Sequence, residues 1–251
     1  SQRSWRARRH VARAEDLPGG FQAANLSGCY LLWGRSHNLG FRYMKYPYRL
    51  LTLLAALAPA YYVVMGVIAT LSQPGYSSVS QTMSQLGATT AAQPWIISSA
   101  FIGYAVLVQA LGPLLQREVG YGKQGRFLWL LVLLYGAGGA LAALFPVGGH
   151  GIVLYQIDQD MAHSIGARLS FAGILSLCVI TPVLLRNRKD WQQWRLFSYA
   201  VFVSTLLLVV PFELDAWEGK RGVLQRGFFV TTMAWVLVTA LRFRRATSKR
   251  D

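Results

Sequence analysis

The chain has 251 residues, of which 53% are hydrophobic and only 14% are charged, and its formal net charge is +15. This balance excludes an ordinary soluble domain and indicates a polytopic membrane protein. The sequence contains no nucleotide-binding loop, nucleophile elbow or paired-cysteine motif, which argues against the familiar soluble chemistries.

The first segment, residues 1–43, is rich in arginine and has no sustained apolar period. Three interpretations stay open: a basic arm on anionic lipid, an amphipathic targeting segment, or an extension upstream of a start at Met44. We favour the third, because MKYPYRLL followed by an apolar run is typical of the beginning of a bacterial inner-membrane protein. We therefore expect a disordered or non-native extension over 1–43 and a membrane domain over 44–251.

Six segments are long and apolar enough to cross a membrane. A transmembrane helix needs about 20 mostly apolar residues, because the hydrocarbon core is about 30 Å thick. Inside hydrocarbon the backbone must satisfy its own hydrogen bonds, which favours helices over strands. We predict an all-α fold, one bundle of six transmembrane helices at about residues 49–71, 94–115, 127–146, 162–184, 196–212 and 224–242.

Lysine and arginine are concentrated on one of the two sides of the predicted bundle. The connections at 72–93 and 147–161 contain neither, and the connection at 213–223 contains only Lys220 and Arg221. The other connections and the carboxyl-terminal tail carry basic clusters. Since basic loops resist translocation, we predict that both termini lie on the cytoplasmic side. The membrane is predicted to be a bacterial inner membrane. Topology and anionic headgroups account for the positive charge, so we expect no binding of nucleic acid.

Titratable side chains gather at the predicted outer ends of the helices. On the fourth helix, Asp160, Ser164 and Arg168 recur every four residues and share a face, with His163 on the next ridge. An unpaired guanidinium inside a span costs a few kcal/mol, so we expect carboxylate partners for Arg168 and for Arg226 of the sixth helix. The other candidate binding residues on this side are Ser80, Ser84, His150, Asp158, Glu213, Asp215 and Gln225.

The first outer connection is polar but uncharged, with five Ser, three Thr and four Gln over residues 72–94. Its stretch VSQTMSQLG is predicted to form a short helix at the membrane interface, with Ser80 and Ser84 one turn apart. Such a segment could cap an outward-facing pocket. The alternative is a plain surface loop.

Several short motifs together resemble a known family. They are PGYSSVSQTMSQLG after the first span, FP at 145–146 closing the third, His163 opening the fourth, and GVLQR at 222–226 opening the sixth. In this order they resemble the bacterial membrane family called domain of unknown function 998, over about residues 48–245. The family often has an acidic residue soon after the Phe-Pro pair, where this chain has VGG. The resemblance implies an architecture and no particular activity.

The sharpest functional hypothesis is a hydrolase or transferase that acts on a lipid or a lipid-linked substrate at the outer headgroup level. His163 would act as general base, oriented by Asp160, while Arg168 neutralises a phosphate. The substrate would occupy a polar cavity formed by the fourth, fifth and sixth helices and covered by the first outer connection. Binding of a lipid or small amphiphile need not mean turnover.

Three alternatives stay open: a structural polar network, a non-catalytic accessory or sensor subunit, and a transporter component. Against transport, the sequence shows no internal repeat and no pair of broken helices, and GAGG at 136–139 indicates close helix packing. His150, His163, Asp158 and Asp160 offer donors that zinc accepts, but without a compact ligand motif, so we expect no metal or other cofactor. Membrane lipids are the predicted partners, and a membrane-protein partner or a homo-oligomer stays open.

Overall fold

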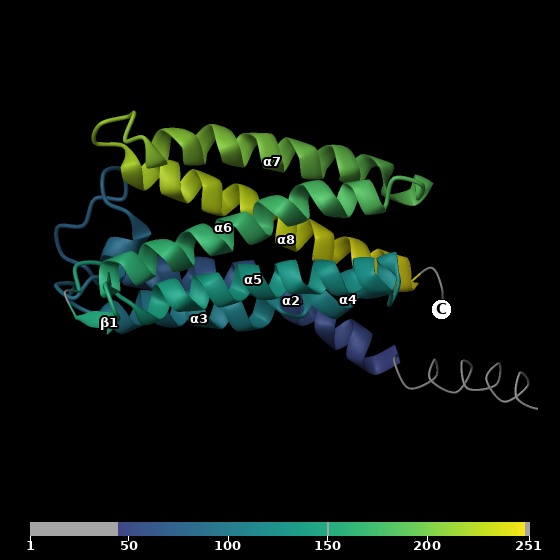
Figure 1. The fold of residues 1–251 in the computed structure, drawn as a ribbon, viewed down its shortest axis with the longest axis horizontal. Coiled ribbons are helices and arrows are strands. Elements are labelled where there is room, and N and C mark those ends of the chain that lie inside the picture. Colours follow the sequence, from purple (N-terminus) through teal and green to yellow (C-terminus); the bar gives the residue numbers. More distant parts are fainter. Residues whose placement is uncertain (1–44, 150, 249–251) are drawn as a thin grey trace, which may run out of the picture. The chain divides into compact units, whose positions relative to one another are not determined.

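The computed structural model describes residues 45–149 and 151–248 (Figure 1). It contains six segments long and apolar enough to cross a membrane, which confirms the predicted all-α six-helix fold. His150 and the predicted extension over 1–43 lie outside the described residues. The helices are α2 (Lys45–Leu71), α3 (Pro94–Val108), α4 (Leu111–Val119), α5 (Lys123–Leu144), α6 (Gln159–Leu184), α7 (Gln192–Glu213) and α8 (Arg221–Ser248). Shorter elements are η2 (Met83–Gly87), η3 (Lys189–Trp191), β1 (Ile152–Leu154) and β2 (Ile157–Asp158).

The two ends of the bundle, at the left and right of Figure 1, differ in their residues. At one end, called here the hairpin end, lie the connections 72–93, 145–158 and 214–220, including the antiparallel β1–β2 pair. The opposite end, called the basic end, carries Arg117, Lys123, Arg126, Arg186, Arg188, Lys189, Arg195, Arg242 and Arg244. The assignment of the hairpin end to the outside of a cell stays a prediction.

The second span is interrupted between α3 and α4, which sequence analysis did not predict. Here the amides of Gln109 and Ala110 donate three residues back instead of four, at 3.2 Å each. Pro113 explains the break, because proline has no amide hydrogen and its ring clashes with the carbonyl four residues earlier. That carbonyl belongs to Gln109. Together α3 and α4 still make one segment of spanning length.

Glycines bring α5 and α6 into backbone contact. A Cβ atom on Gly138 would lie 2.5 Å from the amide nitrogen of Ser170, and one on Gly166 would lie 2.7 Å from the amide nitrogen of Ala142. Real Cβ atoms do not approach so closely, so only glycine allows this packing. The structure thus confirms the close packing predicted for the GAGG stretch.

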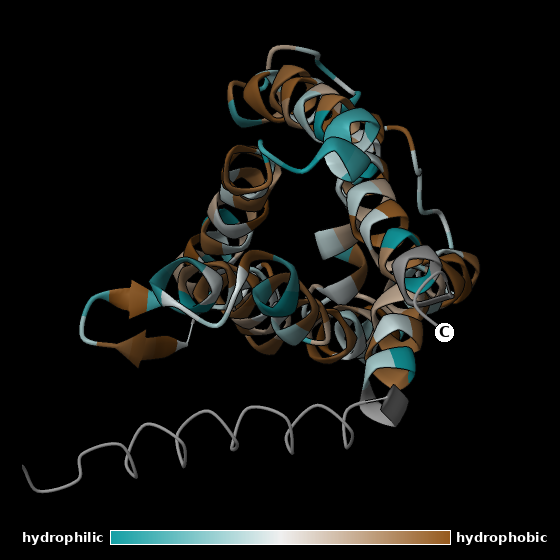
Figure 2. Cartoon of the chain, turned by 90° about the vertical axis from the view of Figure 1, so that its right-hand side faces the viewer, coloured by the Kyte–Doolittle hydropathy of each residue, from teal (hydrophilic) through white to brown (hydrophobic). Residues whose placement is uncertain are grey.

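By contrast, α7 is the least buried of the six spans. It lies close to α6 near the basic end, where the Ser198 hydroxyl donates to the carbonyl of Cys178 (2.8 Å). Toward the hairpin end α6 and α7 diverge in both views (Figures 1 and 2). Many large hydrophobic side chains on the helices are exposed, as expected for side chains that face lipid. Hydrophobic residues predominate along the helices (Figure 2).

Candidate functional site

A cavity of about 500 Å³ lies in the hairpin-end half of the bundle. All six spans and the 72–93 connection contribute lining residues. The sequence-based expectation named only the fourth, fifth and sixth spans, here α6, α7 and α8, but α2, α3 and α5 complete the wall. The cavity therefore lies inside the bundle and reaches down from its polar end.

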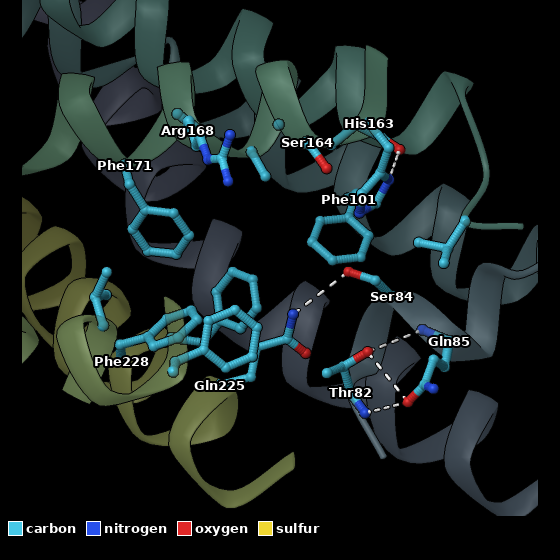
Figure 3. Close-up of a pocket in the computed structure, with 18 of the residues that line it drawn as sticks. Thr82, Ser84, Gln85, Phe101, His163, Ser164, Arg168, Phe171, Gln225 and Phe228 are labelled. Carbon is cyan, nitrogen blue, oxygen red and sulfur yellow. Dashed lines mark hydrogen bonds between the residues drawn. The ribbon is translucent and has the colours of Figure 1, made fainter. Parts of the chain in front are cut away.

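One side of the cavity is covered by residues 76–87, called here the roof segment (Figure 3). The segment ends in the short helix η2, whose N-cap Thr82 exchanges hydrogen bonds with Gln85 in a capping box. Gln225 of α8 binds it from below: its Oε1 accepts the amide of Met83, and its Nε2 donates to the Ser84 hydroxyl (3.4 Å). The predicted short helix is present, but it begins at Met83, after Ser80.

Arg226 fastens the same segment to α8. Its Nη1 donates to the carbonyls of Ser78 (2.8 Å) and Gln81 (3.0 Å), and its Nη2 donates to the Tyr76 hydroxyl (2.6 Å). The prediction of a carboxylate partner for Arg226 is therefore wrong. Backbone carbonyls of the roof segment accept its hydrogen bonds instead. Gly222 allows the approach, because a Cβ there would lie 2.6 Å from the Ser78 carbonyl oxygen.

The predicted polar face of α6 lines the opposite wall. Asp160, His163, Ser164 and Arg168 all border the cavity, as expected from their spacing. Asp160 is exposed, and its Oδ1 accepts the backbone amide of Gly148 (3.2 Å). Asp160 therefore connects the first part of the 145–158 connection to α6, and it is not hydrogen-bonded to His163.

His163 is held by the end of α5. Its Nδ1 lies 2.7 Å from the carbonyl oxygen of Ala142 and 3.0 Å from that of Phe145. Carbonyl oxygens only accept hydrogen bonds, so Nδ1 must carry a proton. In the neutral imidazole the lone pair is then on Nε2, and no residue that the structure describes bonds to that nitrogen. The ring lies among the cavity side chains (Figure 3).

Arg168 and Glu213 form an ion pair between α6 and α7, with Nη2 and Oε2 3.1 Å apart. The expected carboxylate partner of Arg168 is thus present. Side chains on a helix tilt toward its N-terminus. Since α6 starts at the hairpin end, the guanidinium reaches toward that end, where α7 terminates at Glu213.

The deeper part of the cavity is aromatic. Phe171 packs edge-on against Phe228, with ring centroids 4.7 Å apart, and Phe228 lies 5.4 Å from Phe229. At the same level the Tyr104 and Tyr135 hydroxyls hydrogen-bond to each other (2.7 Å), which satisfies two buried phenols. The cavity therefore changes from polar at the hairpin end to aromatic toward the membrane centre.

Not every predicted site residue borders the cavity. Asp158 is instead the N-cap of α6 and accepts the Met161 amide (2.7 Å). Asp215 pairs with Arg221 (3.7 Å) on the exposed surface. The predicted residues that do border the cavity are Ser80, Ser84, Asp160, His163, Ser164, Arg168, Glu213 and Gln225.

Sequence reasoning missed the aromatic residues, because it followed polar side chains only. A signal was present on α8, where Gln225, Phe228, Phe229 and Thr232 recur with helical spacing and share a face. Such a face can equally pack against another helix, so the spacing alone does not reveal a cavity.

In the described ranges 45–149 and 151–248, no three His, Cys, Asp or Glu side chains come together as a set of metal ligands. His150, one of the donors considered from the sequence, lies outside these ranges.

The fold and the cavity define a class, a helical membrane protein whose six spans enclose a polar-to-aromatic cavity. Residues 55–242 match the family described as "Protein of unknown function (DUF998)". The match covers most of the chain, so the chain belongs to this family, as its motifs suggested. No curated protein and no solved structure matches the chain.

Proposed function

We propose that the protein binds a lipid or another small amphiphile in this cavity. The single observation that carries the proposal is the polarity gradient along the helices. The charged side chains and the Gln225 amide border the hairpin end, whereas Phe171, Phe228 and Phe229 cluster farther along the helices, with the paired Tyr104 and Tyr135 hydroxyls. A polar headgroup would lie near Ser84, His163 and Arg168, and an apolar chain would lie among the phenylalanines. A volume of about 500 Å³ is in the range of small-molecule sites.

His163 supports a second candidate, hydrolysis or group transfer on the bound amphiphile. A neutral imidazole with its proton fixed on Nδ1 has Nε2 available as a general base. In hydrolysis, Nε2 would take a proton from water as the oxygen attacks an ester carbon or phosphorus. The imidazolium would then return that proton to the leaving alkoxide as the ester bond breaks. Binding does not depend on this step.

Native mass spectrometry tests the binding proposal. Ala167 lines the cavity, whereas Ala172 on the same helix is exposed on the outside of the bundle. We expect the wild-type protein, released from vesicles of phosphatidylethanolamine and phosphatidylglycerol, to retain a phospholipid. Ala167→Phe should fill the space and lose the lipid, and Ala172→Phe should keep it. Equal retention by both variants would contradict a ligand in this cavity.

A further inference from the structure

The wall of the cavity is closed on most sides. The backbones of α5 and α6 touch through Gly138 and Gly166. On the other side α7 and α8 are joined by a hydrogen bond between the hydroxyls of Thr205 and Thr231 (2.8 Å). At the level of the cavity, the ring of Phe212 of α7 also packs against that of Phe228 of α8, with centroids 5.2 Å apart. Direct contacts thus close the α5–α6 and α7–α8 sides.

The remaining side is the seam between residues 163–171 of α6 and 205–213 of α7, called here the α6–α7 seam. Its two helices diverge toward the hairpin end (Figures 1 and 2), and they share fewer neighbouring residues than α5 and α6 or α7 and α8. Both edges of the seam, for example Phe171 and Val209, line the cavity. At this level one hydrogen bond between α6 and α7 is present among the described residues, from Arg168 Nη2 to Glu213 Oε2.

The roof segment covers a different side. Its helix η2 contacts α2, α3 and α8, and Gln225 and Arg226 of α8 hold it in place. This fastening keeps the roof over the part of the cavity that is remote from α6 and α7. The roof residues Ser80 and Gln85 line the cavity and are exposed, so the polar end of the cavity meets water. The α6–α7 seam, lower along the helices, has no covering segment among the described residues and faces the side of the bundle.

The depth of Arg168 shows which medium reaches the seam. Its Cα lies nine residues after the start of α6, about 14 Å along the helix at about 1.5 Å per residue, and its side chain reaches back toward the hairpin end, to Glu213 at the end of α7. Its side chain is nevertheless 71% exposed. A guanidinium exposed to hydrocarbon is costly, so a spanning segment keeps one there only where polar groups can reach it. Lipid headgroups and water that enter between diverging helices supply such groups.

We infer that the cavity takes its ligand sideways from the bilayer, through the α6–α7 seam and past the Arg168–Glu213 pair. This inference rests on the proposed function and narrows its ligand class to an amphiphile dissolved in the membrane. The headgroup passes Arg168 and Glu213 at the interface, and the chain slides between the helices toward Phe171. A solute that partitions mainly into water does not use this route.

Bridging the seam tests the inference. The variant Arg168→Cys/Glu213→Cys, with Cys29→Ser and Cys178→Ala, is reconstituted and treated with a short bifunctional thiol reagent. Vesicles that carry phosphatidylethanolamine and phosphatidylglycerol with a diazirine in one acyl chain are then fused in. The rate of photolabelling of the peptides around Phe171 and Val209 is compared in this same variant before and after bridging. We expect at least a tenfold lower rate after bridging.

A disulfide across the closed side is the matched control. In Thr205→Cys/Thr231→Cys the bridged helices are α7 and α8, and oxidation should leave the labelling rate unchanged. If bridging α6 to α7 leaves the rate unchanged while cavity peptides are labelled, the inference is wrong and the proposed function stands. If cavity peptides are labelled in no protein, the proposed function itself is wrong, and the inference falls with it.

The wild-type protein provides a second measurement that does not depend on any variant. Labelling of the cavity by the long-chain probe should follow its mole fraction in the bilayer. A dibutyryl diazirine analogue with the same headgroup, kept in water below its critical micelle concentration, should label the cavity at least tenfold less. Equal or stronger labelling by the soluble analogue would overturn entry from the bilayer.

Discussion

Arg226 joins α8 to the roof segment through hydrogen bonds to Ser78, Gln81 and Tyr76. Hydrogen bonds to a charged group contribute about 1.5–3 kcal/mol each, more than neutral ones. The side chain is half-buried, so water replaces these bonds poorly once they are lost. The GVLQR motif thus attaches α8 to the roof segment. Gly222 allows the two backbones to approach, and Gln225 and Arg226 form the hydrogen bonds.

We therefore predict that Arg226→Gln loosens the roof segment. Loss of about 2 kcal/mol of local stability should speed amide exchange in residues 76–87 more than tenfold, as measured by hydrogen–deuterium exchange in nanodiscs. Arg221→Gln, at the exposed first residue of α8, should leave exchange in the roof unchanged, because Arg221 pairs with Asp215 and not with the roof. Equal exchange in wild type and Arg226→Gln would contradict the fastening role.

His163→Asn separates binding from proton transfer. The asparagine amide can still donate to the Ala142 and Phe145 carbonyls, but it has no nitrogen that can act as a base. We predict that lipid retention persists, while hydrolysis of fluorogenic acyl-ester and phosphodiester lipids falls by about 10²–10⁴-fold. Absence of hydrolysis by the wild type would contradict the catalytic candidate and leave the binding proposal intact.

At the scale of elements, the pair α5–α6 depends on specific glycines. Gly138 and Gly139 are neighbours, but only Gly138 faces the α6 backbone, since a Cβ on Gly139 would meet nothing closer than the Ser170 hydroxyl at 3.7 Å. Gly138→Ala should lower the free energy of unfolding by about 1–3 kcal/mol through overpacking. Gly139→Ala should be neutral or stabilising, because alanine favours a helix by about 1 kcal/mol over glycine. Thermal denaturation in detergent checks both, and equal effects would contradict this packing.

The number and placement of the spans could be predicted from length and hydropathy, because the bilayer imposes both. The break before α4 could not. Pro59, Pro182 and Pro211 lie inside continuous helices, whereas Pro113 accompanies an interruption. At the break the side chain of Gln109 donates to the Ala105 carbonyl (2.9 Å), which is a tertiary detail that a proline in the sequence does not reveal.

At the scale of the whole molecule, sequence indicated the level of the site and the face of α6 but not what lies opposite. Arg168 and Arg226 were both expected to need partners within the membrane. Arg168 pairs with a carboxylate, whereas Arg226 donates to backbone carbonyls. The difference depends on which helices are neighbours and on the path of the roof segment. Neither follows from hydropathy.

The charge asymmetry of the two ends predicts orientation. We expect Thr90→Cys, exposed at the hairpin end, to react with a membrane-impermeant maleimide on intact bacteria. Asn187→Cys, exposed at the basic end, should react only after the membrane is permeabilised. The reverse pattern would contradict the predicted topology and would place the cavity toward the cytoplasm.

The most direct measurement is a structure of the protein in bilayers whose phospholipids carry bromine on the acyl chain. If the cavity holds an amphiphile with its polar group at the hairpin end, bromine should appear among Phe171, Phe228 and Phe229 inside the bundle. Bromine found only along the outer surface, with water alone between those rings, would contradict this account.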